Sequence, residues 1–284
     1  MNQISRDEIR SFMEKYHVDY SIADVTPTIC ALFGLTPPDV CGGQEIAEVI
    51  DQAGHIFGED KKAERALIYC PDAVGDIHRQ RYPQYISRVE KLAGMRFLSS
   101  CVMPSVTPVC FGTIFSGASP QVHGIQKYEK KVLEVPTIFD TFVEAGKRVA
   151  IVATNTCSID TIFRKRRIEY YSTCGDARAH EITRRLIERD EYDMIISYYT
   201  SFDSVSHKKG AYSPDGEAAL RTAVEYFETL VADVDKFWGK YDRFVTWTPD
   251  HGNHDIEETK SAHGKDIPED MVVNHYYRLR GKNE

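Results

Sequence analysis

The chain has 284 residues, 42% of them apolar, and a formal net charge of −8 at pH 7. This length and apolar content allow one large domain or two small ones with a sizeable core. The negative charge gives no reason to expect a nucleic-acid polymer as a partner, and no segment approaches the ~20 apolar residues that a membrane-spanning helix needs.

The N-terminal stretch MNQISRDEIRSFMEKY is charged and amphipathic and lacks the apolar core of a secretion signal. The seven cysteines are scattered, with no CxxC pair, which is typical of free thiols in a reducing compartment. Both observations predict a cytoplasmic protein that does not engage a membrane.

Short apolar runs alternate with helical patterns along the chain. The predicted strands are residues 66–70, 148–153, 194–199 and 244–248, whose nearly continuous apolar character is typical of strands buried on both faces. The predicted helices are residues 83–94, 135–146, 175–190 and 214–238. This alternation predicts an α/β fold, a three-layer αβα sandwich with a mostly parallel central sheet. Because no repeat or clear linker interrupts it, we expect a single domain over residues 1–284.

Acidic residues and histidines follow three of the predicted strands. In a parallel sheet, ligands bind beyond the carboxyl ends of the strands, so these side chains are expected to meet at one edge. Each residue alone fits a turn or a surface position, but together they favour a metal site. With one further histidine from a loop, the candidate ligands are Asp72, Asp203, His207, Asp250, His251 and His263. Zinc accepts such oxygen and nitrogen donors, and two roughly four-coordinate ions need about this number.

The stretch SVTPVC, residues 105–110, admits two interpretations. In the first, Thr107 only caps a helix and Pro108 fills its first turn. In the second, Thr107 at the cap is also a nucleophile activated by a metal ion, and the free N–H groups of Val109 and Cys110 form an anion site. The six metal-type residues at the strand ends favour the second interpretation.

These residues resemble the alkaline phosphatase superfamily, nearest its nucleotide pyrophosphatase/phosphodiesterase and phosphonoacetate hydrolase branch. The matching segments are PDAVG (71–75), SVTPVCFGTIFSGASPQVHGI (105–125), SFDSVSHKKG (201–210), PDHGNHD (249–255) and AHG (262–264). The resemblance implies an alkaline phosphatase-like fold. It also implies a two-metal hydrolase of phosphate diesters, pyrophosphates or phosphonates, with zinc as the expected metal and manganese as the alternative.

The resemblance assigns roles to the candidate residues. One ion would be held by Asp203, His207 and His263, and the other by Asp72, Asp250 and His251, with Thr107 beside it. Thr107 would attack phosphorus, and water would hydrolyse the resulting phospho-threonine. The alternatives are a phosphomonoesterase or phosphomutase of the same superfamily, or a catalytically inactive metal-binding homologue.

Two features bear on the substrate, which the sequence does not identify; the oligomeric state is equally open. Cys110 stands where the phosphodiesterase branch usually has an asparagine that contacts a phosphate oxygen. The phosphomonoesterases of the superfamily hold phosphate with an arginine close to the nucleophile. No arginine lies between residues 99 and 147, which weakens the phosphomonoesterase interpretation. The substrate contacts expected from the sequence are Cys110 and Lys208.

The stretch YSIADVTPTICALFGLTPPDVCGG, residues 20–43, resembles the segment that closes the family's domain after the last metal histidine. Here it comes first. Residues 1–50 are therefore expected to be a circularly permuted C-terminal segment, with chain termini that lie close together. A chance helix at PTICALFGL is the alternative.

Overall fold

The computed structural model describes residues 3–58, 62–257 and 259–284, so Met1 and Asn2 of the predicted domain lie outside the described residues. Its main feature is an eight-stranded sheet with the order β1-β3-β10-β7-β2-β6-β4-β5. These strands are β1 (Tyr20–Ser21), β2 (Arg65–Pro71), β3 (Met95–Ser100), β4 (Val149–Thr154), β5 (Glu169–Thr173), β6 (Met194–Tyr199), β7 (Arg243–Trp247) and β10 (Val272–Arg280). Only β10 runs antiparallel to its described neighbours. The predicted α/β fold with a mostly parallel sheet is confirmed.

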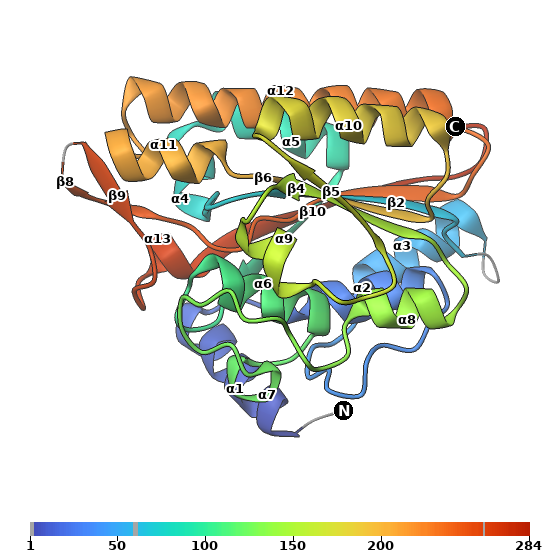
Figure 1. The fold of residues 1–284 in the computed structure, drawn as a ribbon, viewed down its shortest axis with the longest axis horizontal. Helices are drawn as coiled ribbons and strands as arrows, with labels where there is room; N and C mark the ends of the chain where they lie inside the picture. Colours follow the sequence, from blue (N-terminus) through green and yellow to red (C-terminus); the bar gives the residue numbers. More distant parts are fainter. Residues whose placement is uncertain (1–2, 59–61, 258) are drawn as a thin grey trace.

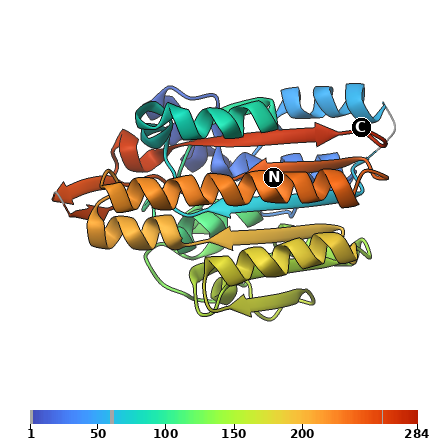
Figure 2. The ribbon, with the colours of Figure 1, turned by 90° about the horizontal axis from the view of Figure 1, so that it is seen from above.

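Helices cover both faces of this sheet, as Figure 1 shows. The upper face in that view carries α4 (Asp76–Arg81), α5 (Pro83–Ala93), α10 (Asp176–Arg189), α11 (Ser201–Lys209) and α12 (Pro214–Phe237). The lower face carries α1 (Gln3–Tyr16), α2 (Val25–Leu32), α3 (Ala47–Phe57), α6 (Thr107–Ser116), α7 (Pro120–His123), α8 (Ile138–Glu144) and α9 (Ser158–Ile162). From above, α10 and α12 run alongside the strands (Figure 2).

Short elements complete the chain. A 3₁₀ turn (Ile22–Asp24) leads into α2, and α13 (Pro268–Met271) leads into β10. A separate two-stranded hairpin consists of β8 (His254–Glu257) and β9 (Lys260–Ala262). This hairpin projects beside α11 and α13 in Figure 1.

Strand β2 shows how the sheet builds two hydrophobic cores. Successive side chains on a strand point to opposite faces. Leu67 and Tyr69 pack with residues of α5, α10 and α12, whereas Ile68 and Cys70 pack with residues of α2, α6 and α8. Because both faces are covered, the strand is apolar throughout, and this continuous pattern is what made it predictable.

The N-terminal segment is integrated into the lower layer. Strand β1 pairs in parallel with β3, with Tyr20 opposite Ser99, and the Thr26 hydroxyl donates to the carbonyl of Ile114 at 2.7 Å. The expectation that the termini lie close together is wrong. Figure 1 shows α1 beneath the sheet and the C-terminus near the level of α12. The two ends are apart because α1 packs onto α7 and does not continue along β10.

None of the helices that the structure describes is long and apolar enough to cross a membrane.

Candidate active site

The six candidate ligands meet at the carboxyl edge of the sheet. Asp72 directly follows β2, Asp203 lies in the first turn of α11 after β6, and Asp250 follows β7. Among the described residues, two groups could each hold a metal ion, with ligand atoms within 4.8 Å of one another. We call Asp203, His207 and His263 the first ligand group, and Asp72, Asp250 and His251 the second.

The first ligand group lies partly open to solvent. Asp203 Oδ1 is 3.3 Å from His207 Nε2 and 3.7 Å from His263 Nε2. The two Nε2 atoms are themselves 3.2 Å apart. The spacing of four residues places Asp203 and His207 on the same face of α11, while His263 reaches them from the loop after β9.

The second ligand group is buried, and only Asp72 borders the cleft described below. His251 Nε2 lies 3.3 Å from Asp250 Oδ2 and 3.7 Å from Asp72 Oδ1. Asp250 Oδ1 accepts a hydrogen bond from the Ala73 amide at 3.2 Å, and the Tyr198 hydroxyl donates to Asp72 Oδ2. The two groups touch through the stacked rings of His251 and His263, whose centroids are 4.0 Å apart.

The same kind of hydrogen bond, from Nδ1 to a backbone carbonyl, orients all three histidines. Nδ1 of His207, His251 and His263 donates to a backbone carbonyl, that of Ser261, Gly252 or Ser105 respectively, at 2.9–3.0 Å. A neutral imidazole that donates from Nδ1 has a lone pair on Nε2. When the three imidazoles are neutral, each Nε2 lone pair therefore points toward carboxylate oxygens, which are also acceptors, and this arrangement fits a cation between them.

The carboxylates give the same indication. One oxygen of each is buried without a hydrogen-bond partner in the described part of the chain: Asp72 Oδ1, Asp203 Oδ1 and Asp250 Oδ2. Buried, unpartnered carboxylate oxygens are costly unless they are paired, protonated or metal-bound. These oxygens are the ones that face the histidine Nε2 atoms, so the donor set fits two divalent cations.

Burial and mutual repulsion set the protonation of the carboxylates. Burial, with the charges of Asp250 and Asp203, raises the pKa of Asp72 well above its ordinary value, and burial raises that of Asp250 to about 7. Burial acts in the same direction on Asp203, but the adjacent imidazole of His207 and the charges of the nearby histidines outweigh it and lower the pKa of Asp203. Without cations, the second ligand group therefore tends to hold protons.

The pKa values of the histidines follow their burial rather than their ligand group. The adjacent carboxylate of Asp203, 3.3 Å away, raises the pKa of His207 to about 8, whereas burial lowers the pKa of His251 and of His263 to about 4. The two enclosed imidazoles are thus neutral at pH 7, which is the form that binds metals.

Thr107 lies beside the second ligand group. Its Oγ1 is 3.3 Å from His251 Nε2, and the residue is only 4% exposed. It also faces a cleft of about 510 Å³, whose wall includes Asp72, Asp203, His207 and His263. A substrate in this cleft would reach the hydroxyl and both ligand groups together.

Two expectations about the start of α6 are wrong. Val106, not Thr107, is the N-cap residue, and Thr107 occupies the first helical position without a capping hydrogen bond. The amides of Val109 and Cys110 are not free, because both donate to the carbonyl of Val106 at 3.0 Å. The Thr107 side chain is therefore turned toward the ligands and is not used by the helix.

The two expected substrate contacts are not supported by the geometry. The Cys110 side chain is fully buried in the hydrophobic core below the sheet, so its thiol does not face the cleft. Lys208 is exposed on α11, next to His207, but outside the residues that line the cleft.

Sequence reasoning missed several residues of the cleft wall. Asn155 directly follows strand β4, so the rule that led to Asp72 could have found it. Tyr128 and Lys130 come from an irregular segment between α7 and α8 that carries no periodic signal. Lys130 Nζ donates to the carbonyl of Thr156 at 2.7 Å, which ties this segment to the loop after β4.

A sequence model of the type I phosphodiesterase / nucleotide pyrophosphatase family matches residues 83–280, more than half of the chain. The match contains Thr107 and five of the six candidate ligands, and it begins after Asp72. No curated protein matches the chain.

Solved structures with the same fold include human ectonucleotide pyrophosphatase / phosphodiesterase 5, at 16% identity and a TM-score of 0.54, covering 68% of this chain and 58% of that one. The inactive murine counterpart in complex with AMP gives 16% identity and a TM-score of 0.54, with 69% and 59% covered. Phosphonoacetate hydrolase from Sinorhizobium meliloti 1021 in complex with phosphonoacetate gives 21% and 0.50, with 68% and 58% covered. The chain thus spans less than two thirds of each relative.

Proposed function

Since the chain belongs to the type I phosphodiesterase / nucleotide pyrophosphatase family, we propose that it is a two-metal hydrolase of phosphate diesters, pyrophosphates or phosphonates. The observation that carries the proposal is the meeting of Thr107 and two metal-type ligand groups on one cleft at the carboxyl edge of the sheet. The relatives that hold AMP and phosphonoacetate support the same range of substrates.

The ligand groups would each hold one divalent ion, with zinc expected and manganese as the alternative. The second group offers two carboxylates and one imidazole and should tolerate the harder manganese better than the first. Bound ions would lower the pKa of a nearby hydroxyl and offset the negative charge that develops on the phosphoryl oxygens.

Thr107 is the nucleophile in this proposal. Its Oγ1 would form a bond to phosphorus while the bond from phosphorus to the leaving oxygen or carbon breaks, and the proton lost by the threonine hydroxyl would end on the leaving group, carried through solvent. Water would then hydrolyse the phospho-threonine and restore the hydroxyl. Low exposure of Thr107 keeps competing water away from the attacking atom.

We place the protein in a reducing compartment such as the cytoplasm, since its cysteines are free.

The test combines metal analysis with turnover of bis(p-nitrophenyl) phosphate. The zinc-loaded protein should hold two ions per chain and hydrolyse the diester. Thr107→Ala should keep the fold and both ions but lose at least ~10²-fold in kcat, since each 1.4 kcal/mol of barrier is a factor of ten. Thr107→Ser, which keeps a hydroxyl, is the matched control and should retain measurable turnover.

Two results would count against the proposal. Activity of Thr107→Ala within about tenfold of the parent would remove the nucleophile assignment. Binding of no more than one divalent ion at saturation would contradict the two-group arrangement, and two ions without turnover of any diester or phosphonate would favour an inactive metal-binding homologue.

A further inference from the structure

Helix α11, which carries two residues of the first ligand group, lacks a cap of its own. Thr200 occupies its N-cap position but makes no side-chain capping hydrogen bond to the helix. The first N–H groups of any α-helix have no partner within the helix and need acceptors from elsewhere. The structure shows where they come from.

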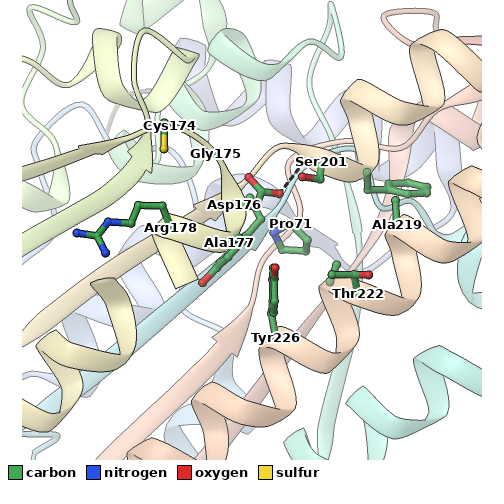
Figure 3. A pocket seen from close by; sticks show the side chains of 13 residues that line it. Pro71, Cys174, Gly175, Asp176, Ala177, Arg178, Ser201, Ala219, Thr222 and Tyr226 are labelled. Atoms are coloured by element: carbon green, nitrogen blue, oxygen red, sulfur yellow. Dashed lines mark hydrogen bonds between the residues drawn. The ribbon is translucent and has the colours of Figure 1, made fainter. Parts of the chain in front are cut away.

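Asp176, the first residue of the neighbouring helix α10, supplies those acceptors. Its Oδ1 accepts from the Thr200 amide at 3.0 Å and from the Thr200 hydroxyl at 3.3 Å, and its Oδ2 accepts from the Ser201 amide at 2.7 Å. Figure 3 shows the carboxylate directed at Ser201. The carboxylate sits at the N-terminal ends of both α10 and α11, where negative charge is favoured.

The position of Asp203 depends on this helix start. Asp203 comes two residues after Ser201, and in the described part of the chain its carboxylate makes polar contacts only with the two histidines of its own group. His207 has an independent anchor, the carbonyl of Ser261, but Asp203 has none. A shift of the first turn of α11 would therefore move the only carboxylate of the first ligand group.

We propose that Asp176 is a positioning residue for the first ligand group. It fixes the start of α11 and thereby the place of Asp203, without touching substrate or metal. This inference rests on the proposed metal-dependent function. It extends that function to a residue on a different helix, whose effect should be confined to one of the two metal sites.

The surroundings of Asp176 make the effect separable from core packing. Asp176 borders a cavity of about 420 Å³, whose wall also includes Tyr199, Phe202 and Tyr226 (Figure 3). Truncating its side chain enlarges a space that already exists and mainly removes the hydrogen bonds to α11. None of the six candidate ligands lines this cavity.

The experiment measures zinc bound per chain at defined free zinc concentrations, by elemental analysis, for the parent, Asp176→Ala and Asp176→Asn. We expect two sites in the parent. In Asp176→Ala one site should weaken about 10–100-fold, the usual effect of losing a residue that orients a metal ligand, and the other should not change. Asp176→Asn keeps the side-chain size and one acceptor and should fall between.

Two controls identify the affected site and exclude a general helix effect. Adding Asp176→Ala to His263→Ala should remove little further zinc, whereas adding it to Asp250→Asn should weaken the remaining site. Ser213→Ala removes a comparable cap from α12, where Ser213 Oγ accepts from the Gly216 amide at 3.0 Å, and α12 carries no candidate ligand. Ser213→Ala should leave both zinc affinities unchanged.

The outcomes separate this inference from the proposed function. If the parent binds two ions and both Asp176 variants bind them with parental affinity, Asp176 has no positioning role. Equal weakening of both sites, or the same weakening in Ser213→Ala, would also overturn the inference. If the parent itself does not bind two ions, the proposed function fails first.

Discussion

Asp72 and Asp250 are buried next to each other with only partial compensation. Asp72 receives a hydrogen bond from Tyr198, and Asp250 receives one from the Ala73 amide, yet each keeps one oxygen without a partner. Such a pair is stable only with a proton or a cation between the oxygens. The dependence of stability on pH should therefore differ between the metal-free and the metal-bound protein.

The first prediction concerns the chelated protein, which we expect to be most stable near pH ~6.5, the ordinary pKa of histidine. Below that, stability should rise with pH, because the unfolded chain binds more protons than the folded one at the six histidines whose pKa burial lowers to about 4: His78, His123, His180, His251, His263 and His275.

Above pH ~6.5 the sign reverses. The folded protein then still holds the proton of His207, whose pKa is raised to about 8, and near pH 7 part of that of Asp250, whose pKa is raised to about 7, whereas the unfolded chain has lost both. Urea unfolding between pH 5 and 8 measures both limbs. Zinc should abolish the decline above pH ~6.5, and Asp250→Asn should reduce it in the chelated protein. Equal stability of the chelated parent at pH 6.5 and pH 8 would contradict the assignment.

At the scale of elements, the helices and strands that could be predicted are those whose burial gives a regular apolar pattern in the sequence. Strand β6 lies at residues 194–199, as expected, because it is buried on both faces and its sequence is nearly all apolar. The other predicted strands and helices are also present, with ends within three residues of the expected ones.

Strand β10 was missed because it buries polar side chains. Asn274 donates to Asp76, His275 pairs with the Pro249 carbonyl, and Arg278 reaches the Leu92 carbonyl and Asp235. The hydrogen-bond partners of these three side chains all lie far away in the sequence. No local pattern in VVNHYYRLR could have revealed them.

The second prediction concerns the turn after β7, which carries Asp250 and His251. A Cβ on Gly252 would lie 1.9 Å from the Glu269 carbonyl oxygen and 3.0 Å from Gly75 Cα. Since both obstacles are backbone, Gly252→Ala should destabilise the fold by about 1–3 kcal/mol or more and weaken the second ligand group. Urea unfolding and zinc content measure the two effects.

Gly54→Ala is the matched control for that substitution. Gly54 lies inside α3, and a Cβ there would meet no atom within 4 Å. The change should stabilise the protein by about 0.5–1 kcal/mol, because alanine loses less conformational entropy in a helix. Tolerance of Gly252→Ala at the level of Gly54→Ala would show that the turn can shift without harm to the site.

At the scale of the whole molecule, the six candidate ligands could be predicted because a parallel sheet brings strand ends together from distant parts of the sequence. The cleft wall could not be predicted in full. Tyr128 and Lys130 reach it through an irregular segment whose path depends on tertiary contacts such as that of Lys130 with the Thr156 carbonyl.

The permutation stays a prediction. We expect that a rearranged chain beginning at β2, with residues 3–57 attached after residue 284 through a flexible linker, folds and binds two zinc ions. The linker must be long, because α1 and the C-terminus lie on different levels of the fold in Figure 1. A rearranged chain that stays soluble but binds no zinc would argue that the N-terminal segment is an independent addition.

The last prediction concerns the amount of the N-terminal segment that the fold needs. Deleting residues 1–43 removes β1, the 3₁₀ turn and α2, including the fully buried Ile22, Val25 and Ile29, and exposes the apolar surface of α6 and of the sheet. We expect insoluble protein, because so large an exposed apolar surface promotes aggregation.

Deleting only residues 1–17 is the control. The buried residues of α1 are Ser5 and Ile9, and its contact with Asp266 through Tyr16 lies at the surface, so this shorter chain should remain soluble and bind zinc. The measurements are the solubility and the zinc content of the two shortened chains. A soluble, active chain of residues 44–284 would mean that the N-terminal segment does not complete the domain, and it would contradict the permutation.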